Sequence, residues 1–134
     1  IKEATGSVDR TISITSKRPD FGVISGDDAI NFAIMTNGGT GTISVTANLL
    51  PDMVSQLIHA TQSGDIHTAA KLNAELYDIN NVLFCESNPI PIKAAMHIAG
   101  LMPNLEYRLP LVGLESANYK RVEDVMNKYE IKGL

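Results

Sequence analysis

The first third of the chain alternates between short strand-like runs and stretches with roughly helical spacing. Residues 21–25 form an apolar run and residues 42–46 a run rich in β-branched side chains, which predicts two strands. Residues 8–17 and 27–36 have apolar positions at approximately helical spacing, which predicts a helix before each of these runs. With a first strand at the opening residues, this order predicts parallel βα units joined by right-handed crossovers.

The remainder of the chain has a helical pattern. Pro51 suits a first helical turn and is followed by an apolar stripe that includes Val54, Leu57 and Ile58. Residues 66–84 carry leucine and isoleucine at near-heptad spacing, so we expect a helix over that range.

Residues 88–91 are expected to be extended, because proline restricts its own backbone and that of the residue before it. Residues 92–101 then predict another helix, with Gly100 near its end. Residues 102–114 contain two prolines and a glycine and are expected to be irregular. Ser116 introduces a last predicted helix, whose apolar face is formed by Val122, Val125, Met126 and Tyr129.

The predicted sheet is thin and its first strand is short. A parallel sheet of three strands leaves both edges unpaired, which is a liability for a folded domain. Only Ile1 precedes Lys2, and the chain opens without an initiator methionine. We therefore expect a fragment or a processed product that lacks an N-terminal partner segment.

Composition narrows the class of protein. The 134 residues suffice for one domain, and 44% hydrophobic with 19% charged residues is typical of a globular protein. A net charge of −4 argues against nucleic-acid binding, which requires a basic surface. We expect no membrane span and no signal peptide, because no apolar run is long enough. The single cysteine, Cys85, has no internal disulfide partner, so a reducing cytoplasm is the expected location.

Lys2 is the first candidate for chemistry. A lysine acts as an amine nucleophile only when burial or neighbouring charge favours its uncharged form. A lysine on a strand between apolar neighbours could meet that condition, whereas the simpler interpretation is a solvated side chain at a chain end. The residues alone leave both interpretations open.

Other polar motifs are weaker. Gly26 and the two aspartates after it could mark a strand end at an active-site face or could simply cap a helix. The glycines at residues 38–41 precede a strand, whereas a phosphate cradle needs them after one, so nucleotide binding is not expected. The histidines lack the paired spacing of metal ligands, and Cys85 is expected to be a buried, inert thiol.

Four blocks carry a family resemblance. They read Ile-Lys-Glu-Ala-Thr-Gly at residues 1–6, Ser-Gly-Asp-Asp at residues 25–28, Ile-Ser-Val-Thr-Ala-Asn at residues 43–48 and Ser-Asn-Pro-Ile-Pro-Ile-Lys at residues 87–93. In that order and spacing they resemble the C-terminal half of the 4-hydroxy-tetrahydrodipicolinate synthase (dihydrodipicolinate synthase) family, within the Schiff-base pyruvate aldolase and N-acetylneuraminate lyase superfamily.

The resemblance implies an α/β fold, the last three strands of a (β/α)8 TIM barrel plus a helical C-terminal extension. Residues 1–64 would form the last βα units and residues 65–134 the extension. Lys2 would lie on the sixth barrel strand, with the seventh and eighth at residues 21–25 and 42–45. Family members are usually homotetramers built as dimers of dimers.

The resemblance also implies a reaction. The family condenses pyruvate with L-aspartate 4-semialdehyde to 4-hydroxy-tetrahydrodipicolinate, on the route to lysine and diaminopimelate, without a cofactor or metal. Lys2 matches the residue that forms the Schiff base with pyruvate. Ile43 matches a residue whose backbone lies against pyruvate, and Gly26 matches a backbone carbonyl that lines the same pocket.

The family's acid–base residues belong to the half that this chain lacks. We therefore expect the isolated chain to be inactive and poorly folded, because closing a barrel requires all of its strands. Two alternatives remain. One is another pyruvate-dependent aldolase of the superfamily, cleaving N-acetylneuraminate or a keto-deoxy-sugar acid. The other is a non-enzymatic α/β binding module.

Overall fold

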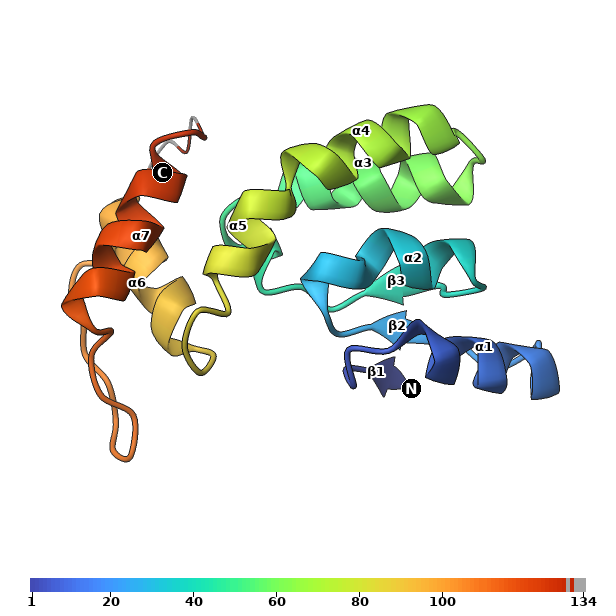
Figure 1. The fold of residues 1–134 in the computed structure, drawn as a ribbon, viewed down its shortest axis with the longest axis horizontal. Helices are drawn as coiled ribbons and strands as arrows, with labels where there is room; N and C mark the ends of the chain where they lie inside the picture. Colours follow the sequence, from blue (N-terminus) through green and yellow to red (C-terminus); the bar gives the residue numbers. More distant parts are fainter. Residues whose placement is uncertain (130, 132–134) are drawn as a thin grey trace.

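The computed structural model describes residues 1–129 and 131, and its centre is a small parallel sheet (Figure 1). Strand β1 is Lys2–Glu3, β2 is Ile24–Ser25 and β3 is Gly41–Thr42, in the order β1-β2-β3. Lys2 lies opposite Ile24, which in turn lies opposite Gly41. The three strand ends therefore meet at one edge, where a parallel α/β sheet places its functional groups.

Helices connect the strands as the pattern predicts. Helix α1 (Val8–Lys17) joins β1 to β2. A 3₁₀ turn (Asp28–Ile30) and helix α2 (Asn31–Thr36) join β2 to β3, and the Asp27 carboxylate caps the turn by accepting from the Ala29 N–H at 3.2 Å. The helix ends at Asn37, and Gly38 follows with φ of +92°, a conformation that favours glycine. The predicted βα order is confirmed.

A short 3₁₀ turn (Thr46–Asn48) leads into the helical part, which begins with a helical hairpin. Helix α3 (Pro51–Gln62) packs against both α2 and α4 (Ile66–Glu75), so the hairpin lies beside the strand-bearing part (Figure 1). Pro51 begins α3, where its missing N–H is not needed.

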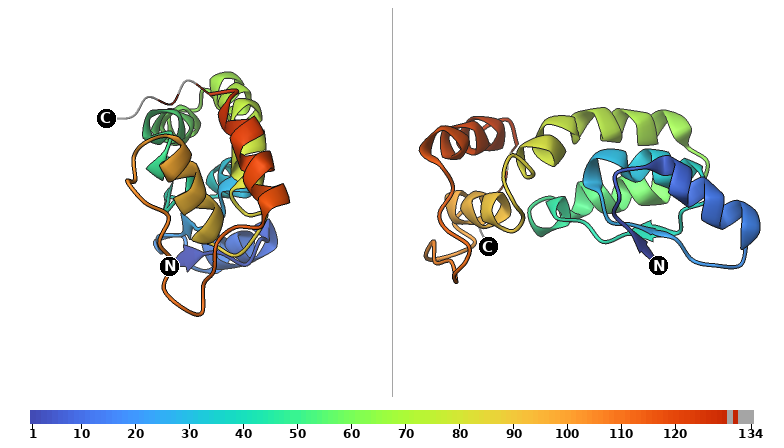
Figure 2. Two further views of the ribbon diagram at one scale, coloured as in Figure 1. Left: turned by 90° about the vertical axis from the view of Figure 1, so that its left-hand side faces the viewer. Right: turned by 60° about the horizontal axis from the view of Figure 1, so that its bottom comes forward.

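Helix α5 (Tyr77–Val82) leads away from the hairpin to the last two helices. Helix α6 (Ile90–Ile98) packs against α7 (Ser116–Met126) at the opposite end of the molecule from α1. The long connection between them projects from the surface (Figure 2). It is anchored by Lys93, whose amine donates to the Glu106 carbonyl and lies 4.8 Å from the centre of the Tyr107 ring.

Three local predictions are wrong. The strand expected over residues 42–46 stops at Thr42, because the Asp28 carboxylate accepts hydrogen bonds from the Val45 and Thr46 N–H groups and turns the backbone. The helix expected over residues 66–84 breaks at Leu76. Residues 88–91 do not form the expected extended segment, because residues 88–89 form a turn and Pro91 lies in the first turn of α6.

The break at Leu76 has a packing reason. Helix α4 lies along α3, whereas α5 turns so that the Asn80 amide donates to the Asp28 carbonyl at 3.0 Å. A single straight helix could not meet both partners. Predicted strand 21–25 is likewise formally only two residues long, although Gly22, Val23 and Gly26 continue its backbone hydrogen bonds on either side.

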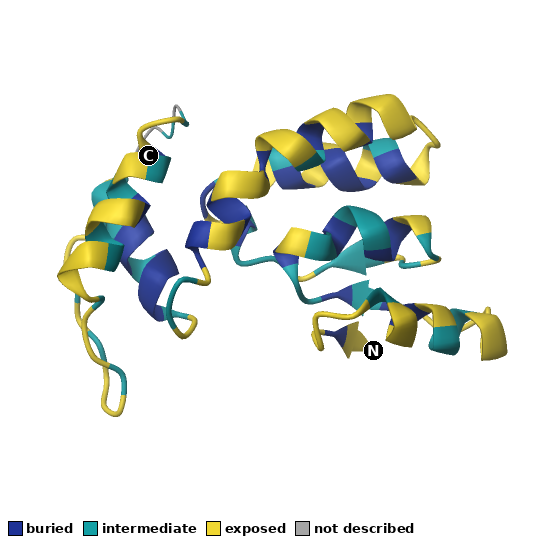
Figure 3. Cartoon of the chain, in the orientation of Figure 1, coloured by how far each residue is buried: buried dark blue, intermediate teal, exposed yellow. Residues whose placement is uncertain are grey.

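Figure 3 shows most of the buried positions on the helices, and the buried apolar side chains are concentrated there. One core cluster contains Leu57 of α3, Leu76 between α4 and α5, and Val122 of α7, all fully buried. Near the strands the buried groups are largely polar, as the next section describes. No helix among residues 1–129 and 131 is long and apolar enough to cross a bilayer.

Candidate active site

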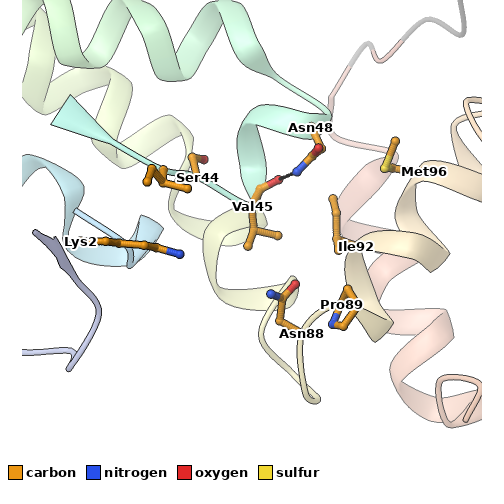
Figure 4. A pocket seen from close by; sticks show the side chains of 9 residues that line it. Lys2, Ser44, Val45, Asn48, Asn88, Pro89, Ile92 and Met96 are labelled. Carbon is orange, nitrogen blue, oxygen red and sulfur yellow. Dashed lines mark hydrogen bonds between the residues drawn. The ribbon is translucent and has the colours of Figure 1, made fainter. Parts of the chain in front are cut away.

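A cavity of about 360 Å³ lies beside Lys2 where the strands end (Figure 4). Its volume is within the range of small-molecule sites. One wall comes from β1 and the segment after β3, and the other from the turn before α6 and α6 itself. The lining residues are Lys2, Ile43, Ser44, Val45, Asn48, Asn88, Pro89, Ile92 and Met96.

Strand alternation turns Lys2 toward this cavity and Glu3 away from it. The Glu3 carboxylate is 2% exposed, accepts from the Thr5 N–H at 2.9 Å and pairs with Arg10 at 2.8 Å. The hydrogen bonds from Thr5, with the Arg10 charge, hold the pKa of Glu3 below its usual value. Glu3 thus fixes β1 from the inner side, whereas the Lys2 amine makes no hydrogen bond or salt bridge to any other residue that the structure describes.

Gly26 makes room for the Lys2 side chain. A Cβ at this position would lie 2.5 Å from Lys2 Cε and 2.9 Å from Lys2 Cγ and Ala4 Cβ, all closer than van der Waals contact. Gly26 itself borders a neighbouring cavity of about 460 Å³ on the other side, with Ala4, Asp27 and Phe84 among its lining residues. That cavity lacks the amine, so we take the Lys2 cavity as the candidate site.

The segment after β3 is held in place on both sides. Ile43 donates its N–H to the Ser25 carbonyl at 2.8 Å, and Val45 donates to Asp28 Oδ2 at 2.7 Å. Between them, the Ser44 hydroxyl accepts from the Ala47 N–H at 2.9 Å. Ile43 and Ser44 therefore line the cavity on a segment that hydrogen bonds hold at both ends, and Ile43 is 54% exposed.

The second wall was missed by reasoning from the sequence. Asn88, Ile92 and Met96 face Lys2 across the cavity (Figure 4). Asn88 makes no side-chain hydrogen bond to any other described residue, so its amide is free to bind a ligand. It lies in the Ser-Asn-Pro block at residues 87–89, which was noted as a motif without a role for its polar side chain.

The structure thus brings Lys2 and Ile43 into one cavity and places Gly26 against the Lys2 side chain. Among the nine lining residues, Lys2 carries the single ionisable side chain. The described residues therefore supply an amine nucleophile, two amides and a hydroxyl, but no carboxylate, histidine or tyrosine that could transfer protons in this cavity. The arrangement is suited to covalent capture of a carbonyl compound.

Residues 1–129 match the Dihydrodipicolinate synthetase family, and the chain belongs to this family. It is 61% identical over 133 residues to a 4-hydroxy-tetrahydrodipicolinate synthase from Sulfurovum sp. (strain NBC37-1), which covers 99% of this chain and 45% of that protein. A synthase from Campylobacter concisus is 58% identical, with the same coverage.

Solved structures agree. Dihydrodipicolinate synthase from Aquifex aeolicus superimposes with a TM-score of 0.92 at 37% identity, over 97% of this chain and 44% of that one. The chloride-inhibited enzyme from Acinetobacter baumannii, complexed with pyruvate, gives 0.88 at 38% identity, over 95% and 44%. The predicted partial (β/α)8 barrel with a helical extension is confirmed, and the chain spans less than half the length of these relatives.

Proposed function

We propose that this chain contributes the nucleophile of a 4-hydroxy-tetrahydrodipicolinate synthase. The observation that carries the proposal is that Lys2 lines one cavity together with Ile43 and Ser44. The names of the relatives, and the pyruvate bound by the Acinetobacter enzyme, support pyruvate as the first substrate and L-aspartate 4-semialdehyde as the second.

In the proposed reaction, the uncharged Lys2 amine attacks the keto carbon of pyruvate, and water leaves to give an iminium. The iminium withdraws electrons, so the methyl group loses a proton and becomes an enamine carbon. That carbon attacks the aldehyde of L-aspartate 4-semialdehyde. The amino group of the second substrate then displaces the lysine by attacking the iminium, which closes the ring and regenerates the Lys2 amine.

The assigned roles of the other residues are part of the proposal. Ile43 presents its backbone to bound pyruvate, and Gly26 contributes a backbone carbonyl and the space that Lys2 needs. A Cβ at position 26 would lie only 2.5 Å from Lys2 Cε, which supports the proposal that Gly26 provides the space that Lys2 needs. Steps that transfer protons use groups from outside this chain, since Lys2 is the one ionisable side chain of the described cavity lining.

We further propose that the chain works within a longer polypeptide, in which residues 1–64 complete a barrel and residues 65–134 form the extension. Coverage of 45% of a relative's length supports this. A homotetramer in the cytoplasm, built as a dimer of dimers, is the proposed assembly. Experiments therefore use the full-length protein, meaning the polypeptide that the natural gene encodes with this chain.

Borohydride trapping tests the nucleophile. We expect full-length protein incubated with pyruvate and borohydride to gain a reduced pyruvyl adduct on the peptide containing Lys2, detected by mass spectrometry. Lys2→Ala should abolish the adduct and turnover. Lys71→Ala, which alters an exposed lysine of α4, should preserve both. An adduct on another lysine, or turnover by Lys2→Ala, would overturn the assignment.

Substrate competition tests the reaction. We expect the full-length protein to consume pyruvate with L-aspartate 4-semialdehyde and to leave N-acetylneuraminate and keto-deoxy-sugar acids uncleaved. An adduct on Lys2 together with cleavage of a sugar acid would retain the nucleophile and replace the synthase with a lyase. Folded protein that binds pyruvate without any adduct would favour a binding module.

A further inference from the structure

We propose that Asp28 is a positioning residue that fixes the Ile43–Ser44 backbone against the substrate in the Lys2 cavity. The assignment rests on the proposed function, because it concerns the same cavity. Asp28 does not line that cavity and acts through the segment that does.

The contacts of the carboxylate are specific. Asp28 Oδ2 accepts from the Val45 N–H at 2.7 Å and from the Thr46 N–H at 3.0 Å, while Oδ1 accepts from Asn31 Nδ2 at 3.0 Å. Asp28 is 1% exposed. Both carboxylate oxygens thus accept hydrogen bonds, Oδ2 from two backbone N–H groups and Oδ1 from one side-chain amide.

A carboxylate buried in this way is costly unless its hydrogen bonds are complete. No lysine, arginine or histidine among the described residues forms a salt bridge with Asp28, so neutral donors alone hold it. A helix-capping role does not explain the burial, because Asp27 already accepts from the Ala29 N–H. The free-energy cost of burying the Asp28 carboxylate is explained if the backbone N–H groups of Val45 and Thr46 must be held in one place.

A wider network fixes the same segment from two further directions. The Thr42 hydroxyl donates to Asn31 Oδ1 at 2.9 Å, which orients the amide that donates to Asp28. The Thr46 hydroxyl donates to Asn80 Oδ1 at 2.7 Å, and Asn80 Nδ2 donates to the Asp28 carbonyl at 3.0 Å. The network therefore joins the end of β2, the end of β3 and helix α5.

The consequence falls on the cavity wall. Ile43 is tied to the Ser25 carbonyl and Val45 to Asp28, so hydrogen bonds at both ends hold the segment that lines the cavity beside Lys2. Reaction rates depend on placement within fractions of an ångström, and a displacement of about 1 Å costs roughly 100-fold. Asp28 would thereby set the distance between the Lys2 amine and a carbonyl lying on this wall.

The chain offers a reciprocal test. In Asp28→Asn, with the Asn31 amide kept in the orientation in which its Oδ1 accepts from Thr42, the new amide NH2 faces either the two backbone N–H groups or Asn31 Nδ2, and all three are donors. Adding Asn31→Asp restores an acceptor: the amide NH2 at position 28 donates to the carboxylate at position 31, and its oxygen accepts from Val45 and Thr46. The Thr42 hydroxyl retains an acceptor throughout.

We expect Asp28→Asn in the full-length protein to raise the KM for pyruvate and lower kcat/KM by about 10- to 100-fold. The double variant Asp28→Asn with Asn31→Asp should recover most of this loss. Hydrogen exchange of the peptide containing Val45 and Thr46 should accelerate in the single variant and slow again in the double variant. Recovery of exchange and KM together identifies positioning.

Ile79→Val is the matched control, since it shortens a fully buried side chain on α5 that makes none of the hydrogen bonds of the Asp28 network. It should lower the melting temperature and leave the KM for pyruvate unchanged. Asp28→Asn with the same melting loss and an unchanged KM would overturn the assignment. If Asp28→Asn does not fold, the double variant and Thr42→Val are measured instead. An unchanged KM for pyruvate in Thr42→Val, together with unaltered hydrogen exchange at Val45, would count against the positioning role.

The outcomes separate this assignment from the proposed function. No pyruvyl adduct on Lys2 of the unaltered protein would overturn both. An adduct of normal affinity in Asp28→Asn, with accelerated exchange at Val45 and Thr46, would overturn the positioning role alone.

Discussion

The strand-bearing part, residues 1–48, and the helical part, residues 49–129, are held together differently. In the helical part, buried leucine, isoleucine and valine side chains from several helices form one core cluster. In the strand-bearing part, fully or nearly fully buried positions include Glu3, Thr11, Ser25, Asp28 and Asn31. The strands themselves are two residues long, so side-chain hydrogen bonds define much of their geometry.

The difference separates robustness from precision. Apolar packing is non-directional and tolerates small shifts, whereas a buried hydrogen bond is strongly dependent on distance and angle. The part that carries Lys2 uses the directional interactions. Changes in the helical part should therefore reduce stability first, and changes near the strands should reduce substrate binding first.

The largest expected effect is on stability. Leu76→Ala removes a fully buried side chain where α4 meets α5, and should lower the free energy of unfolding by about 2–5 kcal/mol. Chemical denaturation of the full-length protein measures it, with pyruvate affinity of the folded fraction unchanged. Leu109→Ala, at a side chain 86% exposed, is the control and should change stability by less than about 0.5 kcal/mol. Equal losses of unfolding free energy in Leu76→Ala and Leu109→Ala would contradict the view that buried apolar packing stabilises the helical part.

An intermediate effect is expected at Gly26. A methyl group there would meet Lys2 Cε at 2.5 Å, so Gly26→Ala should displace the amine and lower kcat/KM by about 100-fold. Gly22→Ala is the control, because its Cβ would meet Thr40 Oγ1 at an ordinary 3.6 Å. Borohydride trapping and steady-state kinetics measure both. Normal trapping in Gly26→Ala would show that Lys2 does not depend on the space beside it.

The smallest effect concerns acid stability. Glu3 has a pKa below its ordinary value, so its stabilising contribution is present at neutral pH, above the unfolded pKa, and is lost as pH falls through the folded pKa. Glu3→Gln should cost about 1 kcal/mol at neutral pH and progressively less in acid. Denaturation across that pH range measures the difference. Asp20→Asn, at an exposed pair with Arg18, is the control and should change the free energy of unfolding by less than about 0.5 kcal/mol.

Much of the fold was predictable because local signals and long-range packing agree. Pro51 at a helix start, the glycine after Asn37 and the apolar stripe of α3 each depend on neighbours in the sequence. The end of β3 at Thr42 was not predictable, because it depends on Asp28, seventeen residues before Val45, accepting the Val45 N–H. The break at Leu76 depends on Asn80 meeting a carbonyl fifty-two residues away.

The candidate site divides in the same way. Lys2 was identified through a motif around it, and the structure adds the cavity without testing its chemical role. Asn88 and Ser44 are neutral side chains whose types are common in turns, so nothing in their spacing indicated a cavity. The end of β3 places Ser44 at the cavity, and the turn before α6 places Asn88 there.

The single ionisable side chain in the described cavity lining has a kinetic consequence. A pH–rate profile with two limbs needs two titrating groups, and this wall supplies one of them at most. Substitutions at Ser44, Asn48 or Asn88 should therefore change the height of such a profile while leaving the midpoints of its limbs in place. Any group that sets the second limb must come from outside the described cavity lining.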